Sequence, residues 1–217
     1  DYENPKPHVG ALTDPHDEMA QSAYLFMGQM YLKDDNLNAA ALAFEKAYKM
    51  PYDESTRETA FYNYALAQSR GGRTPFSSSV KLFQDFLNKF PNSRYASNVE
   101  DYIINSYMTS KDYDNALLCI EALKSPSAKM MKAKQNVLYR LGMRELQAGK
   151  TTSAADFLTR ADELAQYDSK VAQEVKLWLA ETRYRQKKYK QAQTLYNHSV
   201  LHAAAPDAND GRGNYGF

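Results

Sequence analysis

Apolar side chains recur every three or four residues along most of this chain, in short stretches separated by polar or Pro- and Gly-containing breaks. Tyr24, Met27 and Tyr31 follow this spacing, residues 34–36 interrupt it, and Phe44 lies in the next stretch. A spacing of three to four is typical of a helix that buries one face. Because the breaks recur often, the pattern predicts many short helices rather than a few long ones.

A small residue marks the second helix of each expected pair at a nearly constant interval. The successive intervals are 39, 37, 38 and 38 residues, between Ala40, Ser79, Ala116, Ala154 and Ala192. A fixed period of this length indicates a stacked array of similar units. The sequence therefore predicts an all-α fold, an α-solenoid of about five helix-turn-helix repeats.

A second series of small or apolar residues lies in the first helix of each expected pair. It precedes the first series by 12 residues in four of the five units, at Gly28, Ile104, Gly142 and Ala180. In the second unit the position falls on Ala65, 14 residues before Ser79, and residues 71–75 are the expected place of a two-residue insertion. Small residues on both helices would let the pair approach closely. Replacing Ala116 or Ala154 by Leu should then overpack the crossing and cost roughly 1–3 kcal/mol.

Helical repeats are expected over residues 14–205, between an extended lead-in of residues 1–13 and a flexible tail or linker of residues 206–217. The repeats are placed at about residues 20–54, 58–92, 95–128, 134–167 and 172–205. Asp14 is the expected cap of the first helix, and Thr151, Thr152 or Ser153 that of the second helix in the fourth repeat. The chain begins without Met, so we expect a processed form or a part of a longer protein.

Composition narrows the classes of function. Lys and Arg total 27 and Asp and Glu total 26, so charge gives no reason to expect nucleic acid or an anionic membrane as a partner. Cys119 is the single cysteine, which excludes an internal disulfide and a zinc site of several cysteines. No stretch reaches the roughly 20 apolar residues of a membrane helix. We find no nucleotide-binding glycine loop and no nucleophile elbow, so we expect no enzyme activity, small-molecule substrate or cofactor.

The first unit resembles the tetratricopeptide repeat family. The family pattern has an aromatic residue, Leu-Gly and Tyr in the first helix, then Ala, an aromatic residue, Ala and Pro in the second. The matching residues are Tyr24, Met27-Gly28, Tyr31, Ala40, Phe44, Ala47 and Pro51. The resemblance covers about residues 20–204. It implies a right-handed α-solenoid that offers a binding surface rather than a reaction centre.

The second and third units resemble the bacterial envelope branch of that family. Their motifs are Phe90-Pro91-Asn92-Ser93 and Lys111-Asp112-Tyr113-Asp114. Relatives in this branch are periplasmic proteins associated with the Tol-Pal system and lipoproteins of outer-membrane protein assembly. The resemblance implies a periplasmic or outer-membrane-associated protein, with a cytoplasmic location as the alternative. The chain departs from the pattern at Ile104, where Gly is usual, and at Arg183, where Tyr is usual.

In this family the first helix of each repeat lines a concave wall, and the resemblance implies that side chains there bind a peptide or protein partner. Aromatic rings can cover apolar side chains, Asn can pair with a peptide backbone, and Arg can pair with a carboxylate. The candidate partner-binding residues are Tyr62, Arg70, Tyr102, Asn105, Tyr139, Arg140, Met143, Trp178 and Arg185. The alternative is that these residues are solvated or pack between helices. For Trp178 in particular, the core beside Val175 and Leu179 is the other possible position.

Four further groups have ordinary structural interpretations. His198 and His202 share a helix face, but Ser199 stands where a metalloprotease pair has Glu, so no metal site is expected. Residues 183–190 are basic with interleaved Tyr, a pattern found in RNA-binding surfaces, although a solvated turn is the preferred interpretation. Residues 207–211 lack the spacing and the closing Glu of a calcium loop. Cys119 is expected to be a buried structural thiol.

The sequence therefore predicts a non-enzymatic scaffold that binds a protein or peptide through its concave face, within a larger bacterial envelope protein. A purely structural segment of a longer repeat protein is the first alternative, and an RNA-binding solenoid is the second. No polar capping helix follows the last expected helix, so we also expect self-association through that helix.

Overall fold

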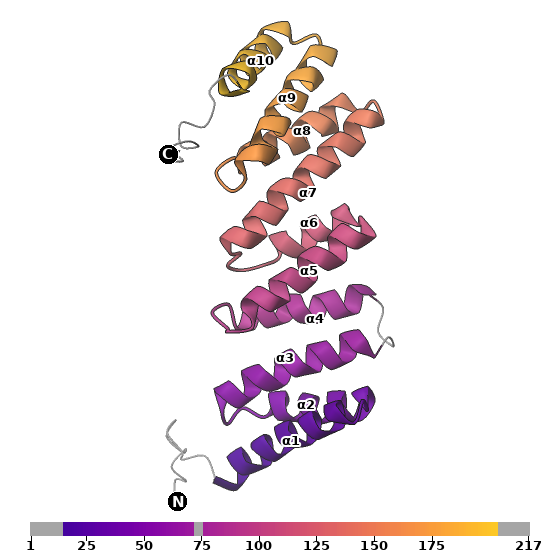
Figure 1. The fold of residues 1–217 in the computed structure, drawn as a ribbon, viewed down its shortest axis with the longest axis vertical. Helices are drawn as coiled ribbons and strands as arrows, with labels where there is room; N and C mark the ends of the chain where they lie inside the picture. Colours follow the sequence, from indigo (N-terminus) through magenta and orange to yellow (C-terminus); the bar gives the residue numbers. More distant parts are fainter. Residues whose placement is uncertain (1–14, 72–75, 204–217) are drawn as a thin grey trace, which may run out of the picture. The chain divides into compact units, whose positions relative to one another are not determined.

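The computed structural model describes residues 15–71 and 76–203 (Figure 1). The expected lead-in of residues 1–13, the cap at Asp14 and the tail of residues 206–217 lie outside the described residues, and so do residues 72–75. In the described part all regular structure is helical and forms ten helices in five successive pairs. The prediction of an all-α fold with about five helix pairs is confirmed.

Each pair consists of a first helix, helix A, and a second helix, helix B. The A helices are α1 (Pro15–Lys33), α3 (Glu54–Arg70), α5 (Ala96–Ser110), α7 (Ala128–Gln147) and α9 (Ser169–Arg185). The B helices are α2 (Leu37–Lys49), α4 (Phe76–Lys89), α6 (Tyr113–Glu121), α8 (Thr151–Asp162) and α10 (Tyr189–Ala203). Helix α7 starts ahead of residue 134 because Ser127 caps it, accepting a hydrogen bond from the Met130 backbone N–H at 3.2 Å.

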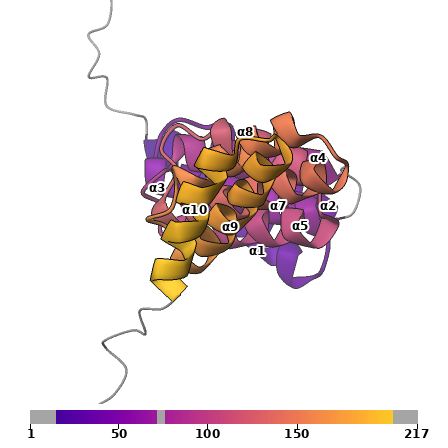
Figure 2. The same ribbon diagram turned by 90° about the horizontal axis from the view of Figure 1, so that it is seen from above.

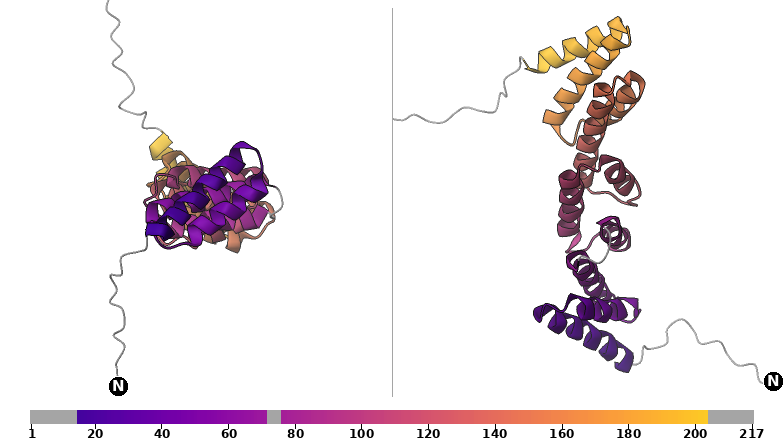
Figure 3. Two further views of the ribbon diagram at one scale, coloured as in Figure 1. Left: turned by 90° about the horizontal axis from the view of Figure 1, so that it is seen from below. Right: turned by 90° about the vertical axis from the view of Figure 1, so that its right-hand side faces the viewer.

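Two compact units divide the chain between Ile103 and Ile104, within α5. In the first unit α1 packs on α2 and α2 packs on α3, as the indigo and purple helices in Figure 3 show. In the second unit α7 packs on α8, α8 on α9 and α9 on α10, and Figure 2 shows α9 and α10 side by side. Within each unit, neighbours in the chain are neighbours in space, as stacked helix pairs require.

The turns between helix A and helix B use a left-handed residue at matching positions. Asp35 and Lys111 have φ of 56°, Lys187 has φ of 61°, and Gly149 has φ of 77°. After three of these residues, the next backbone N–H returns to a carbonyl of the A helix. These bonds join Asn36 to Tyr31 at 2.8 Å, Lys150 to Glu145 at 2.9 Å and Lys188 to Arg183 at 2.9 Å. Because of this hydrogen-bonded helix ending, the segment between helix A and helix B is very short.

The residue after the left-handed position is the N-cap of helix B. The Asn36 side chain accepts a hydrogen bond from the Ala39 N–H, and Asp112 accepts one from Asn115. In the fourth pair the N-cap is Lys150, which makes no side-chain capping bond. The prediction of a cap at Thr151, Thr152 or Ser153 was therefore wrong. Gly149 ends helix A so tightly that α8 already begins at Thr151.

The small residues of the B helices lie in the core, and two glycines of the A helices lie where helix A crosses helix B. Ala40, Ser79, Ala116, Ala154 and Ala192 are all buried. A Cβ atom on Gly28 would collide with the ring of Phe44 in α2. A Cβ atom on Gly142 would lie 2.7 Å from Leu158 Cγ in α8. Each glycine thus admits one large side chain of helix B to the crossing.

Buried side chains of helix A hold the loops that lead from one pair to the next. Gln21 in α1 is fully buried and donates its amide to the carbonyl oxygens of Ala47, Met50 and Asp53, at 3.1, 2.8 and 3.2 Å. Its Oε1 accepts from the Asp53 N–H at 2.7 Å. Since Asp53 is the N-cap of α3, Gln21 fixes where the next A helix begins.

Candidate functional site

In the first unit, two of the predicted partner-binding side chains pack against other rings. Tyr62 is stacked on Tyr95, with ring centroids 4.2 Å apart and an interplanar angle of 7°. The Tyr102 ring centroid lies 4.3 Å from that of Phe83 in α4. Arg70, in the last turn of α3, is exposed. Both tyrosines thus contribute to packing between helices, and Arg70 is the one predicted residue of this unit that is fully accessible to a partner.

In the second unit Tyr139 is buried, although it was expected on a free face. Burial and a hydrogen bond to Glu174 raise the pKa of the Tyr139 hydroxyl to about 12. The Trp178 indole N–H acts in the opposite direction on this hydroxyl and lowers its pKa. Because Glu174 and Trp178 both belong to α9, the Tyr139 side chain is turned toward the next helix pair, and the expectation of an open position was wrong.

Tyr62 and Tyr139 share one position in their repeats, three residues before the small residue of helix A, which is Ala65 or Gly142. In both cases the ring packs toward the chain that follows. Leu177 holds the same position before Ala180, and 44% of its surface is exposed. In these two repeats the position is therefore used for packing on the chain that follows rather than for lining a groove.

Arg140 and Trp178 form a connected surface on the A helices of the second unit. The Arg140 guanidinium lies over the Tyr139 ring, 5.8 Å from its centroid, and Trp178 bonds the hydroxyl of the same ring. Arg140 is exposed, whereas Trp178 and Met143 are half-buried. Trp178 is thus neither fully buried in the core nor fully exposed, which were the two positions considered for it.

Arg185 and Asn105 are exposed as expected, but Arg185 is already engaged. Its Nε lies 2.7 Å from Glu181 Oε1, and the Tyr196 hydroxyl donates to Glu181 Oε2 at 3.1 Å. These contacts lower the pKa of the Glu181 carboxyl, with the Arg185 hydrogen bond as the largest cause. A partner that binds Arg185 must compete with this internal carboxylate.

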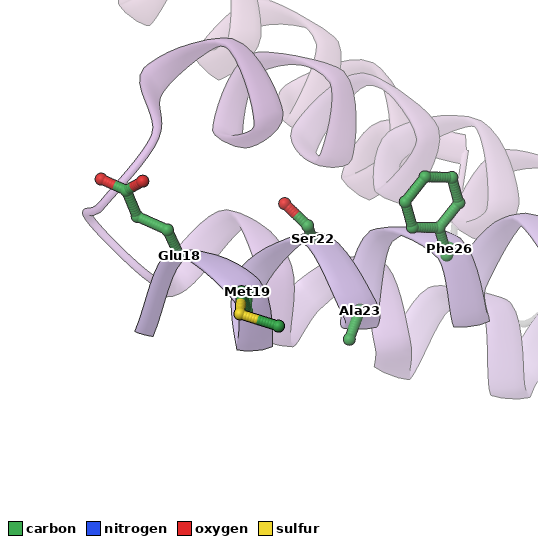
Figure 4. Close-up of a pocket in the computed structure, with 5 residues that line it drawn as sticks. All are labelled: Glu18, Met19, Ser22, Ala23 and Phe26. Carbon is green, nitrogen blue, oxygen red and sulfur yellow. The ribbon is translucent and has the colours of Figure 1, made fainter. Parts of the chain in front are cut away.

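The structure also reveals an apolar face on α1 that the sequence analysis missed. Met19, Phe26 and Met30 are 67%, 65% and 59% exposed. Glu18, Met19, Ser22, Ala23 and Phe26 line an open hollow on this helix (Figure 4). The available signal was the helical spacing of positions 19, 23, 26 and 30, at intervals of four, three and four residues. This pattern begins N-terminal to Tyr24.

The remaining candidate groups have structural roles where the structure describes them. Cys119 is buried, as expected of a structural thiol. Burial and a hydrogen bond with Cys119 raise the pKa of Tyr107 far above its ordinary value. In the basic segment of residues 183–190, the Tyr184 and Tyr189 rings pack edge to face with centroids 5.4 Å apart. The side chains of His198 and His202 lie outside the described residues.

The described residues contain no cluster of three or more His, Cys, Asp and Glu side chains that could hold a metal ion. None of the helices in the same part of the chain combines the length and the apolar character needed to cross a membrane.

Comparisons with known proteins give similarities of structure only. No protein-family model and no curated protein matches the chain. MamA from Desulfovibrio magneticus is 16% identical, covering 87% of this chain and 98% of its own, with a TM-score of 0.38. PilF from Pseudomonas aeruginosa is 17% identical over 88% of this chain and 80% of its own, with a TM-score of 0.37. A putative kinesin light chain from Podospora anserina with TPR-like repeats is 13% identical over 88% and 97%, with a TM-score of 0.36.

Proposed function

We propose that this protein, a chain of tetratricopeptide-like helix pairs, is a scaffold that binds another protein through the A helices of its second unit. The observation that carries the proposal is the connected surface of Arg140 and Trp178 on the ring of Tyr139. The Arg140 cation lies over the ring of Tyr139, and because Tyr139 is buried, this ring offers a fixed support for the exposed cation. Arg and Trp are also the residue types most enriched at the energetic centres of protein interfaces.

The chemistry of this surface defines the segment that it fits. Arg140 offers a planar cation for a carboxylate, and its exposure leaves its donors accessible. Met143 in α7 and Trp178 in α9 offer half-buried apolar surface. A peptide or helix with an acidic residue beside an apolar one satisfies both contacts. The proposed partner is therefore a protein segment of that composition.

A photo-crosslinking residue at position 140 tests the proposal. We expect ultraviolet light to join the chain to a second protein in cells that express it, and Trp178→Ala to weaken that adduct. The matched control places the same photo-crosslinker at Leu118, an exposed apolar residue of α6 in the same unit. Adducts of equal yield at positions 140 and 118 would show unspecific contact, and no adduct at either position would favour a purely structural segment.

We also propose that the protein belongs to the bacterial envelope, as a periplasmic or outer-membrane-associated protein. The support is the resemblance carried by Phe90-Pro91-Asn92-Ser93 and Lys111-Asp112-Tyr113-Asp114. Cell fractionation with antibodies against the chain tests this location. Recovery in the cytoplasmic fraction alone would overturn it. The location and the binding surface are independent, since either can hold without the other.

A further inference from the structure

We infer that the apolar face of α1 binds α1 of a second copy of this chain, in an antiparallel pair related by a two-fold axis. This face is remote in sequence from Arg140 and Trp178, so the pairing is independent of the proposed partner-binding surface.

The position of this face in the repeat shows that it is made to contact a helix. Ala23 lies five residues before Gly28, and the residues five before Ala65 and Ala180 are Ala60 and Val175, which are fully buried. Met30 lies two residues after Gly28, and the matching Ala67 packs with buried residues of α2. In α3 residues of the preceding B helix pack around Ala67 and Ala60 is fully buried, whereas in α1 the matching Met30 and Ala23 are exposed.

Large and small side chains alternate along α1 in a self-complementary order. Met19, Ala23, Phe26 and Met30 follow one another at intervals of four, three and four residues. Placing a two-fold axis between Tyr24 and Leu25 brings Met19 opposite Met30 of the second copy. The same axis sets Phe26 over Ala23 of the second copy, so that a large ring meets a small residue twice.

Charge along one flank of the face is also self-complementary, about a point between Leu25 and Phe26 that lies one residue from the axis of the seam. Glu18, Ser22, Gln29 and Lys33 form this flank, at intervals of four, seven and four residues. In an antiparallel pair of helices related in this way, the same flanks meet. Glu18 then lies near Lys33 of the second copy, and Ser22 lies near Gln29, each pair within the reach of these side chains. Two ion pairs and two polar contacts border the apolar seam.

The exposed area supports the same occupant. Three large apolar side chains on one helix, each more than half exposed, are costly to leave in water. A two-fold pair covers both copies of this face in one contact.

Charge reversal tests the pairing geometry directly. Wild type should be a dimer by light scattering and sedimentation, and Glu18→Lys or Lys33→Glu alone should weaken dimerisation by roughly tenfold or more. An equimolar mixture of the two variants should form a mixed dimer, because both flanks then pair opposite charges. The double variant E18K/K33E should dimerise like wild type, and Phe26→Glu should abolish dimerisation.

Leu118→Glu places the same charge on another exposed apolar residue and should leave the dimer unchanged. Circular dichroism melts of all variants check that each is folded. A monomer at the highest soluble concentration of the full chain overturns the proposal. A dimer that survives Phe26→Glu, or a mixture of E18K and K33E that stays monomeric, overturns it as well.

Discussion

Gln21 and Gln135 make the same contact in two different helix pairs. Each lies seven residues before the glycine at its helix crossing, and each donates its amide to the N-cap residue of the next A helix. Gln21 reaches the Asp53 carbonyl, and Gln135 reaches the Asp168 carbonyl at 3.1 Å. In both cases a buried glutamine side chain hydrogen-bonds one helix pair to the next, and it occupies the same position in the repeat.

The two glutamines differ in how fully they are bonded, and their removal should differ accordingly. Gln21 makes four hydrogen bonds, whereas Gln135 donates one and its Oε1 is buried without a partner among the described residues. We expect Gln21→Ala to lower the free energy of unfolding by about 2–3 kcal/mol and Gln135→Ala by about 1 kcal/mol. Urea denaturation followed by circular dichroism measures both. Equal losses of unfolding free energy would contradict the assignment of Gln21 as the more strongly bonded of the two side chains.

Adding one methyl group at Gly28 should destabilise the first helix pair. An interior Gly-to-Ala change normally stabilises a helix by about 1 kcal/mol. Here the new Cβ meets the Phe44 ring, so Gly28→Ala should cost about 1–3 kcal/mol instead. The double variant Gly28→Ala/Phe44→Leu makes room for the methyl group. If the double variant is no better than the sum of the two single changes, the crossing does not depend on this contact.

Acid should weaken the start of α3 through Asp53. Its carboxylate accepts a hydrogen bond from the Thr56 N–H at 2.6 Å, and hydrogen bonds from Thr56 are the largest causes that lower the pKa of this carboxyl. A folded-state pKa below the unfolded one contributes stability above the unfolded value, and this contribution is lost as the pH falls through the folded value.

Asp53→Asn provides the matched variant, because it keeps an accepting oxygen but cannot titrate. We expect wild type to exceed this variant in stability by a constant amount near neutral pH, and the difference to shrink below pH of about 4. Thermal melts at a series of pH values measure it. A difference independent of pH down to the acid limit of folding would remove Asp53 as the cause.

The left-handed turn residues predict opposite effects of glycine and alanine. Lys111 adopts φ of 56° and should gain about 0.5–1 kcal/mol when replaced by Gly, which has no Cβ to strain. Gly149, with φ of 77°, should lose about 1 kcal/mol when replaced by Ala. Chemical denaturation of both variants compares them. If Lys111→Gly destabilises the protein, side-chain contacts of Lys111 outweigh the backbone strain.

Sequence alone could predict the helix pairs because their crossings depend on size. Ala40 and Ala154 are small for a local steric reason that recurs with every repeat, so their spacing is visible in the chain. The cap of α8 could not be found in this way. Three hydroxyl residues follow Gly149, and the tight left-handed ending sets the cap at Lys150 before them.

The candidate surface was harder to predict because exposure depends on neighbours in space. Tyr139 has the composition of a binding residue, but α9 covers it. Met19 and Phe26 have the composition of core residues, but no described helix covers them. A helix wheel shows which residues share a face, and it cannot show which faces meet another helix. Arg140 is exposed, because a charged residue on a helix is rarely fully buried.

The tight turns within the pairs have a practical consequence for engineering. A tag placed between α7 and α8 would break the bond from Lys150 to Glu145 and displace the start of α8. The segment between α6 and α7, residues 122–127, is longer, and residues 124–126 are exposed. Surface segments of this kind accept insertions best. An epitope or fluorescent label inserted there reports on the protein while leaving every described helix crossing intact.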